Sequence, residues 1–175
     1  MKLIEPNKKY LKKYEQAYIK SIELISLGKM RKHNLMFKSP KEIDLLDNIN
    51  NKTFKKLKVG RVNLYDYFLI DDDENLLGVL SIKPRLSDVL HELDGNIRYG
   101  INPFFWNKGY GAKILELGIQ KAKELGLKDK ILITCDYDNI ASSKIIEKNG
   151  GILQNLATKH VDNENILTKR YWIYL

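Results

Sequence analysis

The middle of the chain combines three signals in an order that restricts the fold. The run Ile97–Ile101 is rich in β-branched and aromatic residues, which predicts a strand. A turn containing Gly109 and Gly111 follows, and it opens a helix whose apolar residues recur on one face until Gly126. The next run, Lys130–Cys135, is apolar on both faces, as expected of a central strand covered on both sides. This order of strand, turn, helix and strand predicts a parallel crossover within an α/β or α+β fold.

The glycine turn has the features of an anion-binding site. Gly109 and Gly111 permit backbone conformations and a close approach that a side chain would block. The unpaired N–H groups of the first helical turn point back toward the same place, and such a site favours a phosphate. Two glycines before a helix also serve as a plain tight turn, so both interpretations stay open at this level.

The remaining elements are predicted from periodicity and turn residues. No repeat, low-complexity tract or linker divides the 175 residues, so we expect one domain spanning residues 1–175. The acidic cluster at 71–75 is predicted to be a hairpin turn, with a metal or cationic substrate as the alternative. In chain order, the other predictions are a helix at 11–27 ending near Gly28, a helix after Ser39 and Pro40, helix surface at the basic run 55–58, hairpin strands at 66–70 and 76–82, a short helix from Asn139 to Asn149, and antiparallel strands at 152–153 and 169–174.

Composition limits the classes of partner. The net charge of +8 admits nucleic acid, but the lysines are spread along the chain with few aromatics between them, which favours a solvated surface. No apolar run is long enough to cross a bilayer, and the N-terminus lacks the apolar core of a signal peptide. Cys135 is the only cysteine, which fits a cytoplasmic protein and an inert core thiol. No His, Cys and Asp grouping has metal-ligand spacing, so we expect no metal.

Two motifs carry a resemblance to a known family. Trp106–Gly111 matches a signature in which Arg or Gln, two residues, Gly, one residue, and Gly or Ala follow one another, and Asn139–Gly150 matches a second signature. With the strand 131–135 between them, residues 96–151 resemble the GNAT superfamily of N-acetyltransferases. Together with residues 85–88, they are similar to a bacterial branch of predicted acetyltransferases without assigned substrates. The resemblance implies a mixed, mostly antiparallel twisted sheet flanked by helices, in which a central parallel strand pair is splayed to hold CoA.

The resemblance also implies the site. Acetyl-CoA would lie between the strands at 97–101 and 131–135, and the Ile101 amide would polarise the thioester carbonyl as an oxyanion donor. Asn139 would contact the pantetheine arm or cap its helix, and both roles are compatible. We expect Asp at Gly109 or Gly111 to abolish CoA binding and leave the fold nearly intact. The implied cofactor-binding residues are Gly100, Ile101, Lys108, Gly109, Tyr110, Gly111, Ala112, Asn139, Ser142 and Ser143.

Three positions depart from the family pattern. Trp106 stands where the family has Arg or Gln, and Ile146 stands where many members have a tyrosine that protonates the leaving thiolate. Tyr137 or Tyr99 are the candidate substitutes for that acid, with core packing as the alternative for both. Asn96 stands where other members place a glutamate base.

The connection that enters the strand at 97–101 offers other bases. His91 and Glu92 lie there, with a solvent-facing loop as the alternative. His33 and His160 belong to no motif.

The predicted function is direct transfer of the acetyl group of acetyl-CoA to a primary amine, with a small-molecule acceptor favoured over a protein. A CoA-binding or regulatory module with weakened catalysis is the alternative, because the usual acid and base are missing. We expect no nucleic acid or membrane partner. The chain is expected to be a monomer, or a homodimer paired through an edge strand such as 171–174.

Overall fold

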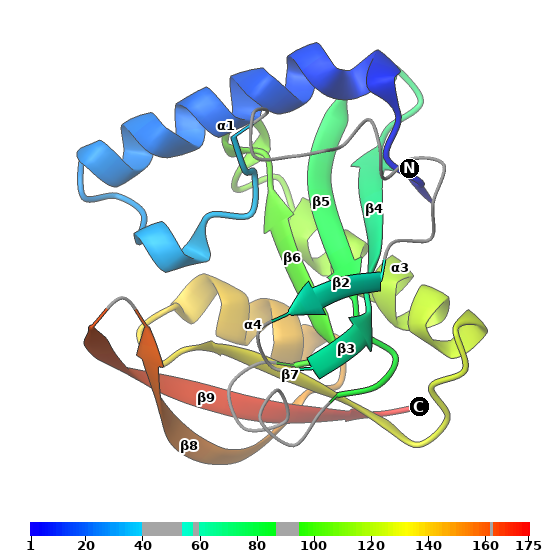
Figure 1. Cartoon of the computed structure of the whole chain (residues 1–175), viewed down its shortest axis with the longest axis vertical. Helices are drawn as coiled ribbons and strands as arrows, with labels where there is room; N and C mark the ends of the chain where they lie inside the picture. The colour runs from blue at the N-terminus through cyan, green and yellow to red at the C-terminus, as the bar shows by residue number, and fades with distance from the viewer. Residues whose placement is uncertain (40–53, 58–59, 87–94, 162) are drawn as a thin grey trace.

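The computed structural model describes residues 1–39, 54–57, 60–86, 95–161 and 163–175 (Figure 1). Short 3₁₀ turns occur at Lys8–Tyr10 (η1), Lys32–Asn34 (η2) and Pro103–Phe105 (η3). The helices are α1 (Leu11–Ser26), α3 (Tyr110–Glu124) and α4 (Ile140–Lys148). The strands are β1 (Lys2–Ile4), β2 (Phe54–Leu57), β3 (Gly60–Asn63), β4 (Tyr65–Ile70), β5 (Leu76–Ile82), β6 (Ile97–Ile101), β7 (Lys130–Asp136), β8 (Ile152–Val161) and β9 (Glu164–Tyr174).

The strands form two main sheets. One has the order β1-β4-β5-β6 and the other the order β7-β9-β8, while β2 and β3 pair separately. Every ladder between the described strands is antiparallel. In Figure 1 the long β8–β9 ribbon curves beneath α4, and β6 and β7 are the strands by which the two sheets approach each other.

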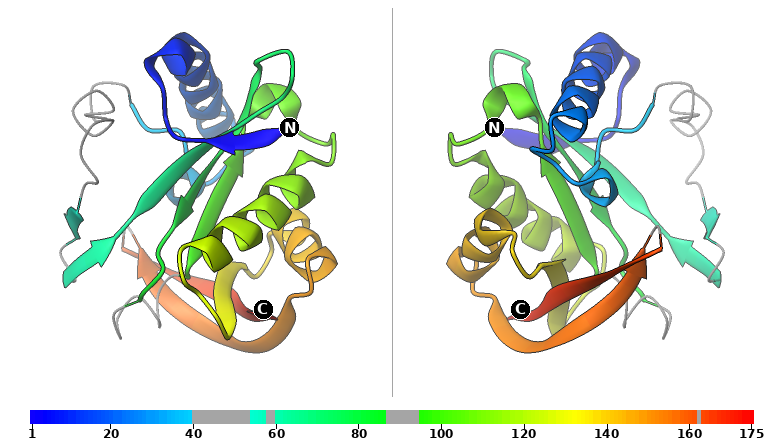
Figure 2. Two further views of the ribbon diagram at one scale, coloured as in Figure 1. Left: turned by 90° about the vertical axis from the view of Figure 1, so that its right-hand side faces the viewer. Right: turned by 90° about the vertical axis from the view of Figure 1, so that its left-hand side faces the viewer.

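Helices cover both faces of the first sheet. Alternate residues of a strand point to opposite faces, so Phe68 packs beside Tyr14 of α1, whereas Leu69 joins the cluster that contains Ile114 of α3. Figure 2 shows α1 and α3 on these opposite faces. Strands β4 and β5 are buried along most of their length because helices cover both faces of this sheet.

Asn96 joins the two sheets. Its backbone N–H donates to Leu132 O (2.7 Å), and its side-chain Oδ1 accepts from Leu132 N–H (2.8 Å). On the other side, Asn96 O accepts from Lys83 N–H (2.7 Å), and the side-chain amide donates to Lys83 O (2.9 Å). The side chain thus replaces a backbone group in each ladder, and it does so while only 7% exposed.

Beyond this junction β6 and β7 run in the same direction and belong to separate sheets. Tyr99 is three residues after Asn96, and Cys135 is three residues after Leu132. The Tyr99 hydroxyl and the Cys135 thiol are close enough to interact electrostatically. Tyr99 also reaches Ser142 of α4, the helix that follows β7, with 3.2 Å between the hydroxyl oxygens. The pair is therefore parallel and diverges toward its carboxyl ends, which confirms the predicted fold class.

Most predicted elements are confirmed. The helix ending near Gly28, the β4–β5 hairpin, β6, α3, β7 and α4 occur where periodicity and turn residues put them. Strands β8 and β9 are longer than predicted, and β1 was too short to leave a periodic signal. The prediction of helix at 55–58 is wrong for β2, where strand pairing overrides the helix propensity of lysine. The helix predicted after Pro40 lies outside the described residues.

Replacing Asn96 by Ala tests the junction. The substitution leaves Leu132 N–H and Lys83 O without their buried side-chain partners, so the free energy of unfolding should fall by roughly 2–4 kcal/mol. Urea denaturation measures this change. Asn155→Ala on exposed β8 is the matched control and should change stability by no more than about 0.5 kcal/mol. Equal stability of the two variants would show that the junction is not held by Asn96.

Candidate functional site

Strand register determines which backbone groups face the divergence of β6 and β7. Asn102 N–H bonds Leu77 O (2.9 Å), and in an antiparallel ladder every second residue pairs this way. The N–H groups of Tyr99 and Ile101 therefore point away from β5, toward β7. The same alternation in the β7–β9 ladder, fixed by the bond from Leu175 N–H to Asp129 O (3.1 Å), turns the backbone of Thr134 toward β6. Tyr99, Ile101 and Thr134 thus offer backbone groups to anything bound between the strands.

Gly100 contributes space rather than hydrogen bonds. Register directs its backbone groups toward Val79 of β5, not toward β7. A Cβ atom at Gly100 would lie 2.6 Å from Cβ of Met36, in the segment that follows η2. Glycine at this position therefore lets residues 31–38, called the η2 segment below, contact β6 directly.

The turn after β6 is anchored by two side chains that point back to the first sheet and to its own strand. Asn102, 4% exposed, donates from its amide to Leu76 O (2.8 Å) and accepts from Phe104 N–H (3.2 Å), which starts η3. Trp106 Nε1–H donates to Ile101 O (2.8 Å). Trp106 at the Arg or Gln position therefore fixes the end of β6, and it leaves the Ile101 N–H available.

The start of α3 is open. Gly109 is the N-cap with φ +81°, a conformation that favours glycine, and no atom lies within 4 Å of the place its Cβ would take. No side chain caps this end, and its first turn contains no acidic residue. Ala112 N–H donates to Gly109 O (3.2 Å), so the donors free to meet an anion are those just before it, at Gly109, Tyr110 and Gly111.

Gly111 has a packing role that the sequence did not reveal. A Cβ atom there would lie 2.4 Å from Cδ1 of Ile145 in α4. The end of the Ile145 side chain can move for a methyl group, but a carboxylate would be buried against it. We therefore expect Gly111→Asp to lower the stability of the fold, which differs from the expectation drawn from the sequence.

Two other residues of the turn, Lys108 and Tyr110, each contact the ring of Phe105. Lys108 is exposed, and its Nζ lies 5.2 Å from the centroid of the Phe105 ring. Tyr110 is half-buried, with its ring centroid 6.2 Å from that of Phe105. These contacts hold the basic side chain beside the open end of α3.

The start of α4 lies across the divergence from β6. Asn139 caps α4 by accepting from Ser142 N–H (3.0 Å), so its helix-cap role is confirmed. Ser142 Oγ faces the Tyr99 hydroxyl (3.2 Å). Ser143 is buried and turned inward, with its Oγ 3.5 Å from Cys135 Sγ and accepting from Lys169 Nζ (3.2 Å). Burial raises the pKa of the Cys135 thiol, which agrees with an inert core residue.

Two tyrosines can be compared as proton donors. Tyr99 lies between the strands, and burial raises the pKa of its hydroxyl, so the group keeps its proton at neutral pH. Tyr137 is 50% exposed beside β9, with Lys169 Nζ 5.1 Å from its ring centroid. Ile146, at the family position of the acid, is fully buried in the core and has no polar atom.

The predicted base candidates His91 and Glu92 lie outside the described residues. Asn96, at the family position of a glutamate base, is committed to the junction of the sheets. Within the part of the chain that the structure describes, no group of three or more His, Cys, Asp or Glu side chains is arranged to hold a metal ion. No described helix has the length and apolarity needed to cross a membrane.

Sequence reasoning missed a polar cluster at the end of β7. Asp136, 2% exposed, accepts from Asn34 Nδ2 (2.9 Å) and lies 2.7 Å from Nε2 of His33, both in η2. Arg31, just before η2, pairs with Asp138, and Lys159 of β8 has its Nζ 3.8 Å from Asp136 Oδ1. The partners are about 100 residues apart in the chain, so no local motif could have revealed them.

Comparison with known proteins identifies the family. The model of the acetyltransferase (GNAT) domain matches residues 29–152, and the chain therefore belongs to this family. No curated protein matches the chain.

Solved structures of similar fold include several acetyltransferases. The spermidine N-acetyltransferase from Vibrio cholerae, in complex with CoA and spermine, is 15% identical with a TM-score of 0.65, over 98% of this chain and 94% of that one. The ribosomal L7/L12 α-N-protein acetyltransferase RimL is 14% identical with a TM-score of 0.68, over 99% and 89%. The microcin C7 self-immunity acetyltransferase MccE, in complex with acetyl-CoA and AMP, is 17% identical with a TM-score of 0.67, over 99% and 91%. At these identities the likeness shows the fold.

The two glycines of the turn should respond differently to aspartate. Gly109→Asp places a carboxylate at an open helix start, so acetyl-CoA affinity should fall roughly 10- to 100-fold, the equivalent of one lost charged hydrogen bond or more. Its melting temperature should fall by a few degrees because aspartate is strained at φ +81°, and Gly111→Asp should lower it for a different reason, the burial of a carboxylate against Ile145. Calorimetric titration and thermal unfolding measure the two effects. Unchanged affinity in Gly109→Asp would contradict an anion site at this turn.

Proposed function

We propose that residues 1–175 form one domain that transfers the acetyl group of acetyl-CoA directly to a primary amine. The observation that supports this most strongly is the divergence of β6 and β7, with the Ile101 N–H facing it and the uncapped start of α3 beside it. A thioester bound there would meet a hydrogen-bond donor, and its phosphates would meet a helix N-terminus. Both ends of one extended cofactor are thus accommodated.

In this proposal the pyrophosphate of CoA lies at the backbone N–H groups of Gly109, Tyr110 and Gly111, with Ala112 closing the turn behind them. Lys108 adds a positive charge at the edge. The pantetheine arm follows β6 between Tyr99 and Thr134, whose backbone groups face each other across the divergence. Asn139, Ser142 and Ser143 form the α4 side of this path, with only Ser142 turning its hydroxyl toward β6. No metal is required.

The Ile101 amide is the proposed oxyanion donor. When an amine attacks the thioester carbonyl, negative charge develops on the carbonyl oxygen, and a donor already in place stabilises it. Trp106 supports this role because its indole occupies Ile101 O and holds the end of the strand in position. Bringing amine and thioester together can supply roughly 7–11 kcal/mol of the barrier, so positioning is the largest contribution.

The acceptor is proposed to be a small-molecule amine. Relatives of similar fold act on spermidine and on a ribosomal protein, so the fold accommodates both small and macromolecular amines. The alternative is a CoA-binding or regulatory module without catalysis, and the burial of Ile146 in place of an acid is the observation that favours it. Cytoplasmic location, with no nucleic-acid or membrane partner, is part of the proposal.

An amine panel tests the function. Purified protein is titrated with acetyl-CoA by calorimetry, and CoA release is then followed with spermidine, L-lysine, kanamycin and a peptide with a free N-terminus. The proposal expects acetyl-CoA binding and acetylation of at least one amine above the hydrolysis background. Tight binding with no acetylated amine would favour the regulatory module, and no binding would contradict both.

A pair of Tyr→Phe variants separates the candidate acids. Tyr99→Phe removes a buried hydroxyl between the strands, and we expect kcat to fall about 10- to 100-fold, because a thiolate leaves fairly easily without full acid catalysis. Tyr137→Phe should have the smaller effect, since its ring is half exposed. Steady-state CoA release measures both. The reverse order would assign the proton donor to Tyr137.

A further inference from the structure

The η2 segment spans the divergence from one sheet to the other. At its start His33 contacts Asp136 at the end of β7, and three residues later Met36 lies against Gly100 of β6. Phe37 then packs under α1, with its ring centroid 5.2 Å from that of Tyr14. The Tyr14 hydroxyl accepts from Lys38 N–H (3.0 Å) and holds the end of the segment.

This segment lies on the face opposite the helices of the proposed CoA site. Cys135 and Asp136 are consecutive in β7, so their side chains point to opposite faces. Cys135 faces Ser143 of α4, and α4 packs on α3 through Gly111. Asp136 therefore faces the other side, where an acceptor would approach a thioester already covered by α3 and α4.

The carboxylate of Asp136 is ionised and only partly satisfied. Burial pushes the pKa of Asp136 upward, but hydrogen bonds from His33 and Asn34 outweigh burial, and the net pKa lies below its ordinary value. Both of these bonds go to Oδ2. Oδ1 is buried and, among the described residues, accepts no hydrogen bond. Its cationic neighbour, Nζ of Lys159, lies 3.8 Å away, which is beyond hydrogen-bond distance, so Oδ1 can still accept a hydrogen bond from a bound molecule or water.

The contact with Asp136 fixes the proton of His33. A carboxylate only accepts, so Nε2 carries a hydrogen and donates it, and the lone pair of the unprotonated form of the ring is therefore on Nδ1. Among the described residues Nδ1 of His33 makes no hydrogen bond. The His33 side chain is 11% exposed, so the ring is held in place and still reaches solvent.

We propose that His33 takes the proton of the acceptor amine and that Asp136 is the positioning residue that orients it. The inference rests on the proposed function. His33 and Met36 are three positions apart in the chain, so their Cα atoms are at most about 11 Å apart, and Met36 touches Gly100, the residue next to Ile101. The acceptor amine would enter between these residues, where a water within hydrogen-bond reach of both Nδ1 and the amine would relay the proton.

The reaction balances with these groups. The ammonium form of the acceptor first gives one proton to Nδ1 of His33, which passes it on to solvent. The neutral nitrogen then bonds to the carbonyl carbon, the C–S bond breaks with its electron pair on sulfur, and the second proton lost by nitrogen goes to the departing thiolate. Asp136 Oδ1 accepts a hydrogen bond from the incoming amine or from the relaying water.

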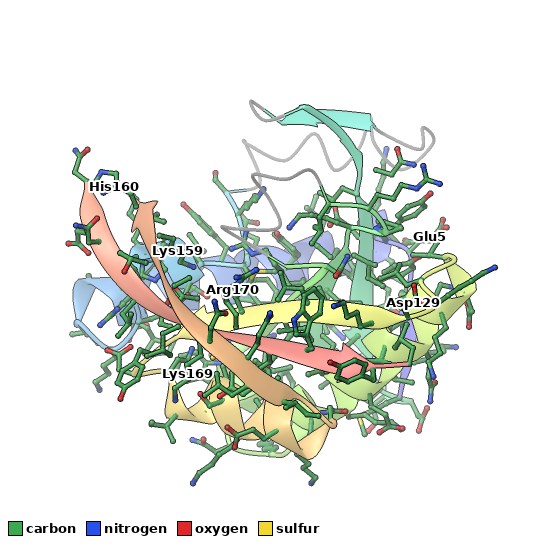
Figure 3. The ribbon with its side chains drawn as sticks, turned by 90° about the horizontal axis from the view of Figure 1, so that it is seen from below. Glu5, Asp129, Lys159, His160, Lys169 and Arg170 are labelled. Carbon is green, nitrogen blue, oxygen red and sulfur yellow. The ribbon has the colours of Figure 1, made fainter. Side chains whose placement is uncertain are left out.

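The surrounding charges are balanced. Arg31 of the η2 segment pairs with Asp138 of the turn before α4, and its guanidinium also lies 3.9 Å from Asp136 Oδ2. Lys159 of β8 has its Nζ 3.8 Å from Asp136 Oδ1. Figure 3 shows Lys159 and His160 near one end of the β8–β9 ribbon, away from Glu5 and Asp129. The cationic side chains of Arg31 and Lys159 therefore lie beside the pair of His33 and Asp136. The carboxylates of Asp136 and Asp138 balance their charge.

The test compares His33→Gln with two controls. Glutamine keeps a donor for Asp136 but removes the base, and His160→Gln makes the same change at an exposed histidine of β8. Asn34→Ala removes the other bond to Asp136 Oδ2 and keeps the base. The assay uses acetyl-CoA and the amine of the panel that the wild type acetylates fastest.

We expect kcat of His33→Gln to fall roughly 100-fold or more, with acetyl-CoA affinity and melting temperature unchanged. The wild type, His160→Gln and Asn34→Ala should lose activity as the pH falls through the range where imidazoles titrate. The activity of His33→Gln should not show this decrease. Hydroxylamine, which is largely unprotonated at neutral pH, should be acetylated by His33→Gln at a rate much closer to that of the wild type.

Two results would overturn the proposal while leaving the proposed function in place. One is a wild-type rate and pH profile in His33→Gln. The other is an equal loss in His33→Gln and Asn34→Ala for both acceptors, which would mean that the pair only holds the η2 segment. Loss of the acid limb in His91→Gln but not in His33→Gln would assign the base to His91. If the wild type acetylates no panel amine, the proposed function itself has failed.

Discussion

The bridge that Asn96 makes between Lys83 and Leu132 is the contact on which the candidate site depends. Among the described residues, hydrogen bonding continues from β5 through β6 to β7 at Asn96, because the asparagine side chain supplies groups that the backbone alone cannot. Past it the strands belong to different sheets, and backbone groups that a continuous sheet would pair are left facing each other. A sheet that opens in this way can bind an extended ligand through its main chain, so little depends on particular side chains.

Because the expected cofactor site consists mainly of backbone groups, the departures from the family pattern change it little. Trp106 replaces a family polar residue, yet its indole still anchors the end of β6, and Ile146 packs in the core where an acid would stand. The backbone donors of Ile101 and of the α3 start are unaffected by either change. Proton transfer does need side chains, and we propose that it depends on residues outside the motifs: Tyr99 between the strands, and the His33 and Asp136 pair on the opposite face.

Local signals predicted the cofactor half of the fold well. Helix α3, strand β7 and the turn at Gly109 follow from periodicity and glycine placement, because each is determined by neighbours in the chain. Tertiary pairing decided the rest. The strand β2 overrode a lysine-rich helical pattern, and the role of Gly111 emerged only from its contact with Ile145. His33 and Asp136 are joined by folding alone, so a single sequence without their spatial relation could not mark them.

The account is tested most directly by a crystal structure grown with acetyl-CoA. It predicts density for the cofactor between β6 and β7, with the pyrophosphate within hydrogen-bond distance of the N–H groups of Gly109, Tyr110 and Gly111 and the thioester oxygen at the Ile101 N–H. Trp106 should still bond Ile101 O, and His33 should face the thioester from the side opposite α4. Cofactor bound elsewhere on the molecule, or β6 and β7 closed into one continuous ladder, would contradict it.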